Sequence, residues 1–85
     1  MKPVTIYSTC ECAYCVRAKA LLQSKQVAYT EYLVDREPER RAEMERRSHG
    51  RRTVPQIFIG DRHVGGCDEL YALNRQGELD RLLAD

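Results

Sequence analysis

Residues 8–19 read STCECAYCVRAK and place three of the chain's four cysteines within six positions. The residues before this stretch (VTIY, 4–7) are β-branched and aromatic, which favours a strand, and the apolar spacing over 15–25 favours a helix. Cys12 and Cys15 therefore form a C-x-x-C pair at a strand-to-helix junction. Because residues i and i+3 of a helix lie on one face, the two sulfurs are close enough for a disulfide in the first turn.

This junction predicts a reactive sulfur at Cys12. The first turn of a helix has unpaired N–H groups and the positive end of the helix dipole, and both stabilise a thiolate. An unperturbed thiol is only a few per cent ionised near pH 7, so we expect the junction to favour the thiolate, which is the attacking species. Arg17 and Lys19 can add to this effect. Cys15, one turn deeper, is expected to be the resolving thiol.

The rest of the chain alternates between strand-like and helical patterns. The expected elements are a strand at 4–7, a helix at 15–25, a strand at 27–34, a helix at 36–50, two strands within 56–64, a helix within 65–77 and a helix at 78–83. Gly60-Asp61 is typical of a tight hairpin, and the first two strands, joined through a helix, are expected to be parallel with a right-handed crossover. These features predict a single α/β domain over residues 1–85, with a four-stranded mixed sheet flanked by helices on both faces.

Two helices carry more detailed expectations. In the helix at 15–25, Val16 and Ala20 are expected to share the inner face with the apolar residues Cys15, Ala18, Leu21 and Leu22. In the helix within 65–77, Asp68 is a good N-cap residue, and Gly77 is expected to end the helix.

Composition limits the classes of function. The 85 residues include 14 basic and 13 acidic side chains, a formal net charge of +1, and this near-balance argues against a nucleic-acid binder, which needs a basic surplus. No apolar run approaches the ~18–20 residues that span a bilayer, so no membrane association is expected. The N-terminus lacks the apolar segment of a signal peptide, so the cytoplasm is the expected location. In reducing surroundings, clustered cysteines are more often catalytic or metal-binding than structural.

A metal site is the alternative to redox chemistry. Zinc usually takes four ligands, and outside the cluster the chain offers only Cys67, His49 and His63, at no recognised spacing. A single C-x-x-C in a βαβ context is the redox pattern. A structural zinc knuckle made by Cys67 and the three clustered cysteines is the distant alternative.

The segment TVPQIFI (53–59) suggests a second part of a site. Proline at a strand entrance removes an N–H group and can adopt the cis form. A cis Pro55 would turn the backbone of Thr53 and Val54 outward, where the Val54 N–H and C=O can pair with an extended peptide. Alternatively, Pro55 only starts the strand, and the residues alone do not choose between these readings.

Four stretches in combination resemble the glutaredoxins of the short single-domain bacterial type: CAYC after VTIYS, AKALL in the helix, TVPQIFI and GGCDELYAL. The resemblance covers nearly the whole chain. It implies the thioredoxin fold with Pro55 in the cis form. It also implies a glutathione-dependent thiol–disulfide oxidoreductase that reduces protein–glutathione mixed disulfides and protein disulfides. The implied partners are glutathione and such proteins, with the chain itself a monomer.

The resemblance carries specific roles over to this chain. Cys12 matches the family's nucleophile and Cys15 its resolving cysteine. The implied glutathione groove has an aromatic beside the bound thiol, a segment that pairs with the cysteinyl backbone, and a loop that holds the γ-glutamyl end: Tyr14; Thr53, Val54 and Pro55; Gly66, Cys67 and Asp68. Arg51, Arg52 or Gln56 are expected to meet the glycine carboxylate.

Three positions depart from the family pattern. Ala13 stands where many relatives have proline, and members without that proline sometimes hold a [2Fe–2S] cluster between two chains through the nucleophilic cysteine and glutathione. Such a cluster-binding dimer using Cys12 is the alternative function. Thr9 stands near the place where relatives often carry lysine, and Cys10 is either a spare loop thiol or a regulatory partner of the pair. The sequence leaves open the roles of Cys10 and Cys67.

Overall fold

The computed structural model describes residues 2–84. Over these residues the elements are β1 (Val4–Ser8), α1 (Ala13–Ser24), β2 (Tyr29–Leu33), α2 (Pro38–Arg47), β3 (Gln56–Ile59), β4 (Arg62–Gly65), α3 (Cys67–Arg75) and α4 (Glu78–Leu83). They form one sheet in the order β2-β1-β3-β4, in which β1 is parallel to β2 and antiparallel to β3, and β3 is antiparallel to β4. The predicted mixed four-stranded sheet is confirmed.

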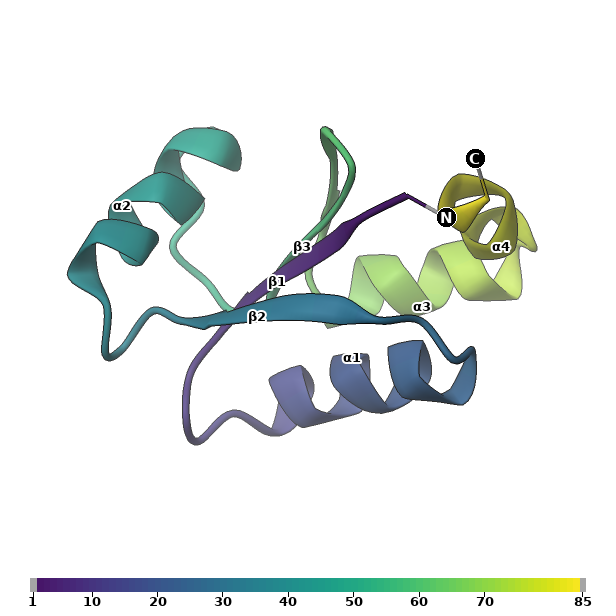
Figure 1. Ribbon diagram of the computed structural model, residues 1–85, viewed down its shortest axis with the longest axis horizontal. Helices are drawn as coiled ribbons and strands as arrows, with labels where there is room; N and C mark the ends of the chain where they lie inside the picture. Colours follow the sequence, from purple (N-terminus) through teal and green to yellow (C-terminus); the bar gives the residue numbers. More distant parts are fainter. Residues whose placement is uncertain (1, 85) are drawn as a thin grey trace.

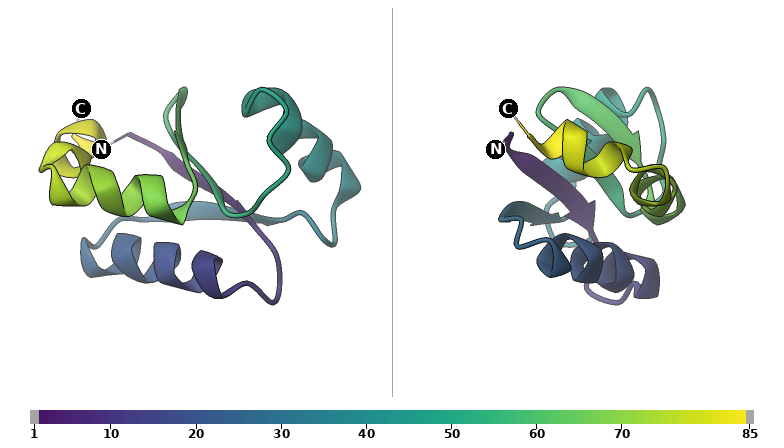
Figure 2. Two further views of the ribbon diagram at one scale, coloured as in Figure 1. Left: turned by 180° about the vertical axis from the view of Figure 1, so that it is seen from behind. Right: turned by 90° about the vertical axis from the view of Figure 1, so that its right-hand side faces the viewer.

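Helices cover both faces of this sheet, as predicted. Figure 1 shows α1 and α3 on one side of the strands and α2 on the other, and Figure 2 shows the same layers from behind and from the side. The alternation of side chains along β1 explains the layers: Val4 and Ile6 join one buried cluster, whereas Tyr7 joins another with Phe58 and Met44.

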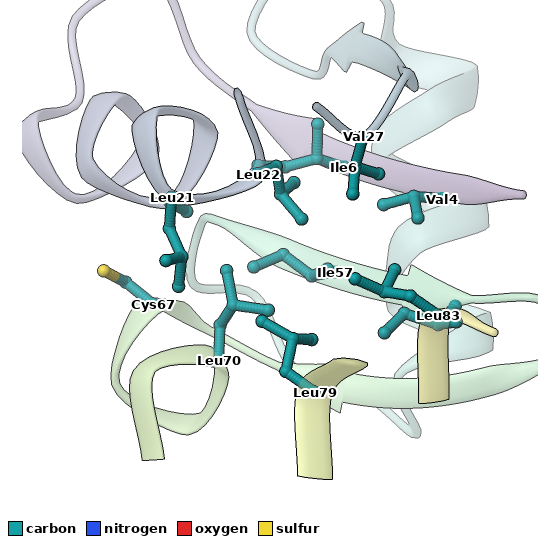
Figure 3. Packing of buried hydrophobic residues seen from close by; sticks show 12 residues of the cluster. Val4, Ile6, Leu21, Leu22, Val27, Ile57, Cys67, Leu70, Leu79 and Leu83 are labelled. Atoms are coloured by element: carbon teal, nitrogen blue, oxygen red, sulfur yellow. The ribbon is translucent and has the colours of Figure 1, made fainter. Parts of the chain in front are cut away.

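The larger cluster lies between the sheet and the helices α1, α3 and α4 (Figure 3). Ile6, Leu22, Ile57 and Leu70 are fully buried in it. Burial of one such side chain contributes about 1.5–3 kcal/mol relative to its exposure. This core therefore fixes α1 against β1 and sets where the first turn of α1 lies.

The opposite face combines a small apolar cluster with arginine side chains. Met44 is the only fully buried side chain that α2 contributes, so the apolar face of α2 is as thin as its sequence suggested. The guanidinium of Arg47 lies 4.1 Å from the centre of the Phe58 ring, and that of Arg40 lies 3.9 Å from the centre of the Tyr32 ring. Cation–π contacts of this kind attach a polar helix to an aromatic surface.

Two helices, α1 and α3, differ in detail from the sequence-based expectations. Val16 is 60% exposed and Ala20 is also exposed, because α1 buries only the narrow stripe through Cys15, Ala18, Leu21 and Leu22. Helix α3 begins at Cys67 with Gly66 as its N-cap, not at Asp68, because the Glu69 side chain takes up the Gly66 N–H. No helix within residues 2–84 is long and apolar enough to cross a membrane.

Candidate functional site

The C-x-x-C pair lies where β1 leads into α1. Cys12 is the N-cap of α1, and its Sγ accepts a hydrogen bond from the backbone N–H of Cys15 at 3.1 Å. A hydrogen bond to the charged form favours that form, and the N-terminal end of the helix dipole acts in the same direction. Cys12 is half-buried, whereas Cys15 is only 1% exposed, and both thiols are free. An incoming sulfur can therefore reach Cys12 but not Cys15.

The environment of Cys15 keeps its thiol protonated near neutral pH. Burial, with a smaller contribution from a hydrogen bond with the Cys12 side chain, raises the pKa of Cys15 to about 12. A hydrogen bond from the backbone of Thr9 and the charge of Lys19 act in the opposite direction. The pair is thus asymmetric: the accessible Cys12 sulfur can attack first, and the buried Cys15 thiol is protonated and can react only afterwards.

A cavity of about 180 Å³ lies beside the pair and is built from three separate segments of the chain. Its lining residues are Tyr14, Arg51, Thr53, Val54, Pro55, Gly66, Cys67, Asp68 and Glu69. It brings together all seven residues that the resemblance placed in a groove. The Val54–Pro55 peptide bond is cis, as that resemblance implied.

The three residues expected at the glycine end of the groove have different surroundings. Arg51 lines the cavity, whereas Arg52 does not: its side chain is 81% exposed and lies 3.8 Å from Glu45. Gln56 is fully buried, and its amide donates to the carbonyl and the hydroxyl of Thr53 at 3.0 and 3.1 Å. Gln56 thus braces Thr53 from behind and does not line the cavity, so the expectation for its side chain is corrected.

The far end of the cavity is formed by the start of α3. Asp68 is exposed in the first turn of α3 and lines the cavity. The Glu69 Oε1 accepts the Gly66 N–H at 2.5 Å and lies 3.8 Å from the guanidinium of Arg51. The sequence reasoning missed Glu69, although a glutamate three residues after an N-cap is the signal of a capping box.

The two remaining cysteines have different surroundings. Cys67 is buried and packs with Leu21 and Leu70 in the larger cluster (Figure 3), and this burial raises the pKa of its thiol. Cys67 therefore lines the cavity as a neutral thiol. Cys10 is exposed, and its backbone N–H donates to the Asp35 carboxylate at 3.2 Å. Within residues 2–84, no three His, Cys, Asp or Glu side chains gather as a metal site, so this arrangement does not support the zinc knuckle.

Comparison with known proteins gives a consistent result. The family model described as Glutaredoxin matches residues 4–64. A protein named glutaredoxin from Pseudomonas aeruginosa is 57% identical over 84 residues, which cover 99% of each chain. The solution structure of glutaredoxin from Brucella melitensis is 57% identical with a TM-score of 0.84, over 98% of this chain and 89% of that one. A crystal structure of a buckwheat glutaredoxin–glutathione complex is 34% identical with a TM-score of 0.86, over 96% of this chain and 76% of that one.

Proposed function

The chain belongs to the glutaredoxin family, and from this we propose that it reduces protein–glutathione mixed disulfides and protein disulfides through Cys12 and Cys15, with glutathione as co-substrate. The observation that carries the proposal is the accessible Cys12 sulfur at the N-terminus of α1, next to a groove that contains a cis proline. The solved buckwheat relative in complex with glutathione supports this choice of co-substrate.

The monothiol route uses Cys12 alone. Its thiolate attacks the glutathione sulfur of a mixed disulfide, a bond forms between Cys12 and glutathione, and the protein leaves as a thiolate that takes up a proton. A second glutathione thiolate then attacks the sulfur of the bound glutathione, which releases glutathione disulfide and regenerates the Cys12 thiolate. The Cys15 N–H, 3.1 Å from the Cys12 sulfur, stabilises the anion at the start and at the end of the cycle.

The dithiol route also needs Cys15. When Cys12 has formed a mixed disulfide with a protein substrate, Cys15 attacks the Cys12 sulfur and releases the reduced protein. Because burial keeps Cys15 protonated and out of solvent, it does not compete with Cys12 for the first attack.

The groove fits the chemistry of glutathione along its length. The Thr53–Pro55 segment offers a backbone edge to the cysteinyl residue, in the manner of strand addition. The Asp68 carboxylate suits the γ-glutamyl ammonium, and the N–H groups at the start of α3 suit the γ-glutamyl carboxylate. Arg51 also lines the cavity and is the cation available for the glycine carboxylate.

Serine replacements at the two cysteines test the proposal. With a glutathionylated peptide as substrate, Cys12→Ser is expected to abolish activity, and Cys15→Ser is expected to keep it. With a protein disulfide as substrate, both variants are expected to lose activity. Cys10→Ser is the matched control, because it removes an exposed thiol that is outside the pair and does not line the cavity. Deglutathionylation by Cys12→Ser at the wild-type rate would refute the assignment.

A second candidate function rests on Ala13, which takes the first helical position of α1. A [2Fe–2S] cluster would be held by Cys12 and by glutathione in the groove of each of two chains, and it would supply iron–sulfur transfer chemistry. The donor set fits, because Cys12 is the accessible sulfur of the pair. Anaerobic purification with glutathione tests this candidate: a colourless monomer with full reductase activity would eliminate it.

A further inference from the structure

A polar cluster lies beside the dithiol and takes no part in the mechanism above. It consists of Ser8 at the end of β1, Lys19 on α1 and Glu31 on β2, and we call it the Glu31 cluster. One carboxylate oxygen of Glu31 accepts hydrogen bonds from the Ser8 hydroxyl at 2.5 Å and from the Lys19 ammonium at 2.8 Å. Ser8 is fully buried, and the side chains of Lys19 and Glu31 are only 24% and 27% exposed. Glu31 therefore joins three neighbouring elements by its side chain.

Ser8 and Lys19, the two residues that Glu31 holds, are each connected to Cys15. Lys19 follows Cys15 by four residues, and side chains at this spacing are neighbours on one face of a helix. Ser8 directly precedes Thr9, whose backbone hydrogen-bonds the Cys15 sulfur. One connection thus runs through a charge and the other through the backbone.

The charges of the cluster are set near neutral pH. Burial opposes ionisation of Glu31, but the hydrogen bonds from Lys19 and Ser8 outweigh it and lower the pKa of this carboxyl. The hydrogen bond to Glu31 likewise raises the pKa of Lys19. An ammonium and a carboxylate therefore stand side by side near Cys15, and the field of the first is partly cancelled by the second.

Other titratable groups near Cys15 are few. On α1 they are Cys12 and Lys19, which act on Cys15 directly. On β2, Glu31 binds Lys19. On α3, which packs against α1, burial keeps Cys67 neutral. Lys19 is thus the one cation among these groups, and Glu31 controls its net effect.

We infer that Glu31 is a positioning residue for the resolving step: it holds Lys19 and Ser8 beside the dithiol and thereby sets how readily Cys15 releases its proton. This inference rests on the proposed function. In that step the Cys12–Cys15 disulfide forms, and the bond between Cys12 and the substrate sulfur breaks. The substrate sulfur leaves with the electron pair and takes up the proton that Cys15 gave up. The cysteine pair is oxidised by two electrons, and the substrate is reduced.

Two isosteric substitutions have opposite expected signs. Glu31→Gln keeps hydrogen-bonding groups for Ser8 and Lys19 but removes the negative charge, so the Lys19 ammonium acts on Cys15 uncompensated and favours its thiolate. Lys19→Gln removes the cation and disfavours the thiolate. If a substitution changes the thiolate population of Cys15 tenfold, the nucleophilicity of that thiolate changes about threefold in the opposite direction. The rate of the resolving step then changes about threefold. We therefore expect the resolving step to be about threefold faster in Glu31→Gln and about threefold slower in Lys19→Gln.

The experiment follows the two releases of thionitrobenzoate from Ellman's reagent by stopped flow, using the full chain in a Cys10→Ser background. Cys12 causes the first release, whose rate depends on reagent concentration. Cys15 causes the second, which is unimolecular. The rate of the second release, measured between pH 6 and 8, isolates Cys15. Lys25→Gln is the matched control, because it removes the same charge at the other end of α1, where Lys25 pairs with Asp80 at 2.8 Å, and it is expected to leave the rate of the second release unchanged.

The outcomes separate this inference from the proposed function. Opposite shifts of the pH profile in Glu31→Gln and Lys19→Gln support the inference, because a loosened fold would slow the step in both variants. Shifts in the same direction, or no shift, overturn it. Deglutathionylation by the wild-type chain is measured alongside: if it occurs and the shifts fail, the function stands and only the role of Glu31 is wrong. If it does not occur, the proposed function itself fails.

Discussion

Replacement of Gly65 by alanine should destabilise the start of α3 more than any other glycine substitution at positive φ in the described chain. Gly65 has a φ of +116°, a conformation that side chains rarely adopt, and it ends β4 just before the N-cap of α3. A Cβ at this position would lie 2.8 Å from the Glu69 Oε1 and 3.1 Å from two carbons of the same side chain. Glu69 would have to leave the Gly66 N–H that it caps.

The expected loss of stability has two parts. A left-handed conformation costs a residue with a side chain about 1–2 kcal/mol. Loss of the capping hydrogen bond costs a further ~0.5–2 kcal/mol. The total of about 1.5–4 kcal/mol corresponds to a fall in Tm of about 6–32 °C in a domain of this size, at about 4–8 °C per kcal/mol.

Thermal and urea unfolding of four variants measures the two parts separately. Gly50→Ala is the matched control, because Gly50 has a φ of +94° and open space around its missing Cβ, so it should lose only the backbone part. Glu69→Ala removes the cap alone. In the double variant, Gly65→Ala should cost no more than Gly50→Ala, since the side chain that it displaces is gone.

Two results would refute this reasoning. One is that Gly65→Ala unfolds at the same temperature as Gly50→Ala, which would mean that the displaced cap contributes nothing. The other is that Gly65→Ala loses the same stability with and without Glu69, which would assign the whole effect to the backbone.

Three further predictions concern other parts of the molecule. Burial, with a smaller contribution from the charge of Arg51, lowers the pKa of His63 from its ordinary value of 6.5. Below pH 6.5 the unfolded chain therefore binds a proton at His63 more readily than the folded chain does. Stability should therefore fall as the pH drops from about 6.5 through the lowered native pKa. The urea midpoint of His63→Gln should change less between pH 7.5 and 5.5 than that of the wild-type chain, and an equal change in both would contradict this. Met44→Ala should cost about 2–5 kcal/mol in urea unfolding, against about 0.5 kcal/mol or less for the exposed Glu39→Ala, and equal losses would show that α2 does not depend on its one buried side chain. Asp68→Asn should raise the KM for glutathione about tenfold at constant kcat, as expected for loss of a charged contact, and an unchanged KM would show that the Asp68 carboxylate does not bind glutathione.

Local sequence patterns predicted the order and type of every element. The switch from β-branched residues before Ser8 to helical spacing after Cys12, and the Gly60-Asp61 turn, carry this information within a few residues. The errors lie where a side chain's neighbour comes from elsewhere. The spacing of Val16 fits the inner face of α1, but its side chain is exposed. The sheet and α3 cover only a narrow stripe of α1, and Val16 lies outside that stripe.

The candidate site shows the same division. The cis form of Pro55 was predicted through the resemblance and is confirmed. The accessibility of Cys12 and the burial of Cys15 agree with the roles that motif and resemblance suggest for them, and these roles stay predictions. The side chain of Gln56 was misplaced, because inward-facing and outward-facing positions of β3 cannot be told apart when all four of its residues are buried. The cluster of Ser8, Lys19 and Glu31 was not predicted at all, because its members come from three elements and none belongs to a motif.

The sequence by itself determined the geometry of the dithiol, because the i, i+3 spacing at a helix start is set by the backbone within one turn. It also determined that the N-terminus of α1 would offer free N–H groups to a sulfur, which is a property of any helix. Tertiary packing decided which sulfur is accessible and which is buried, which segments line the groove, and which carboxylate faces Lys19. These depend on solvent exclusion and on charges brought together from distant parts of the chain, and no local pattern encodes them.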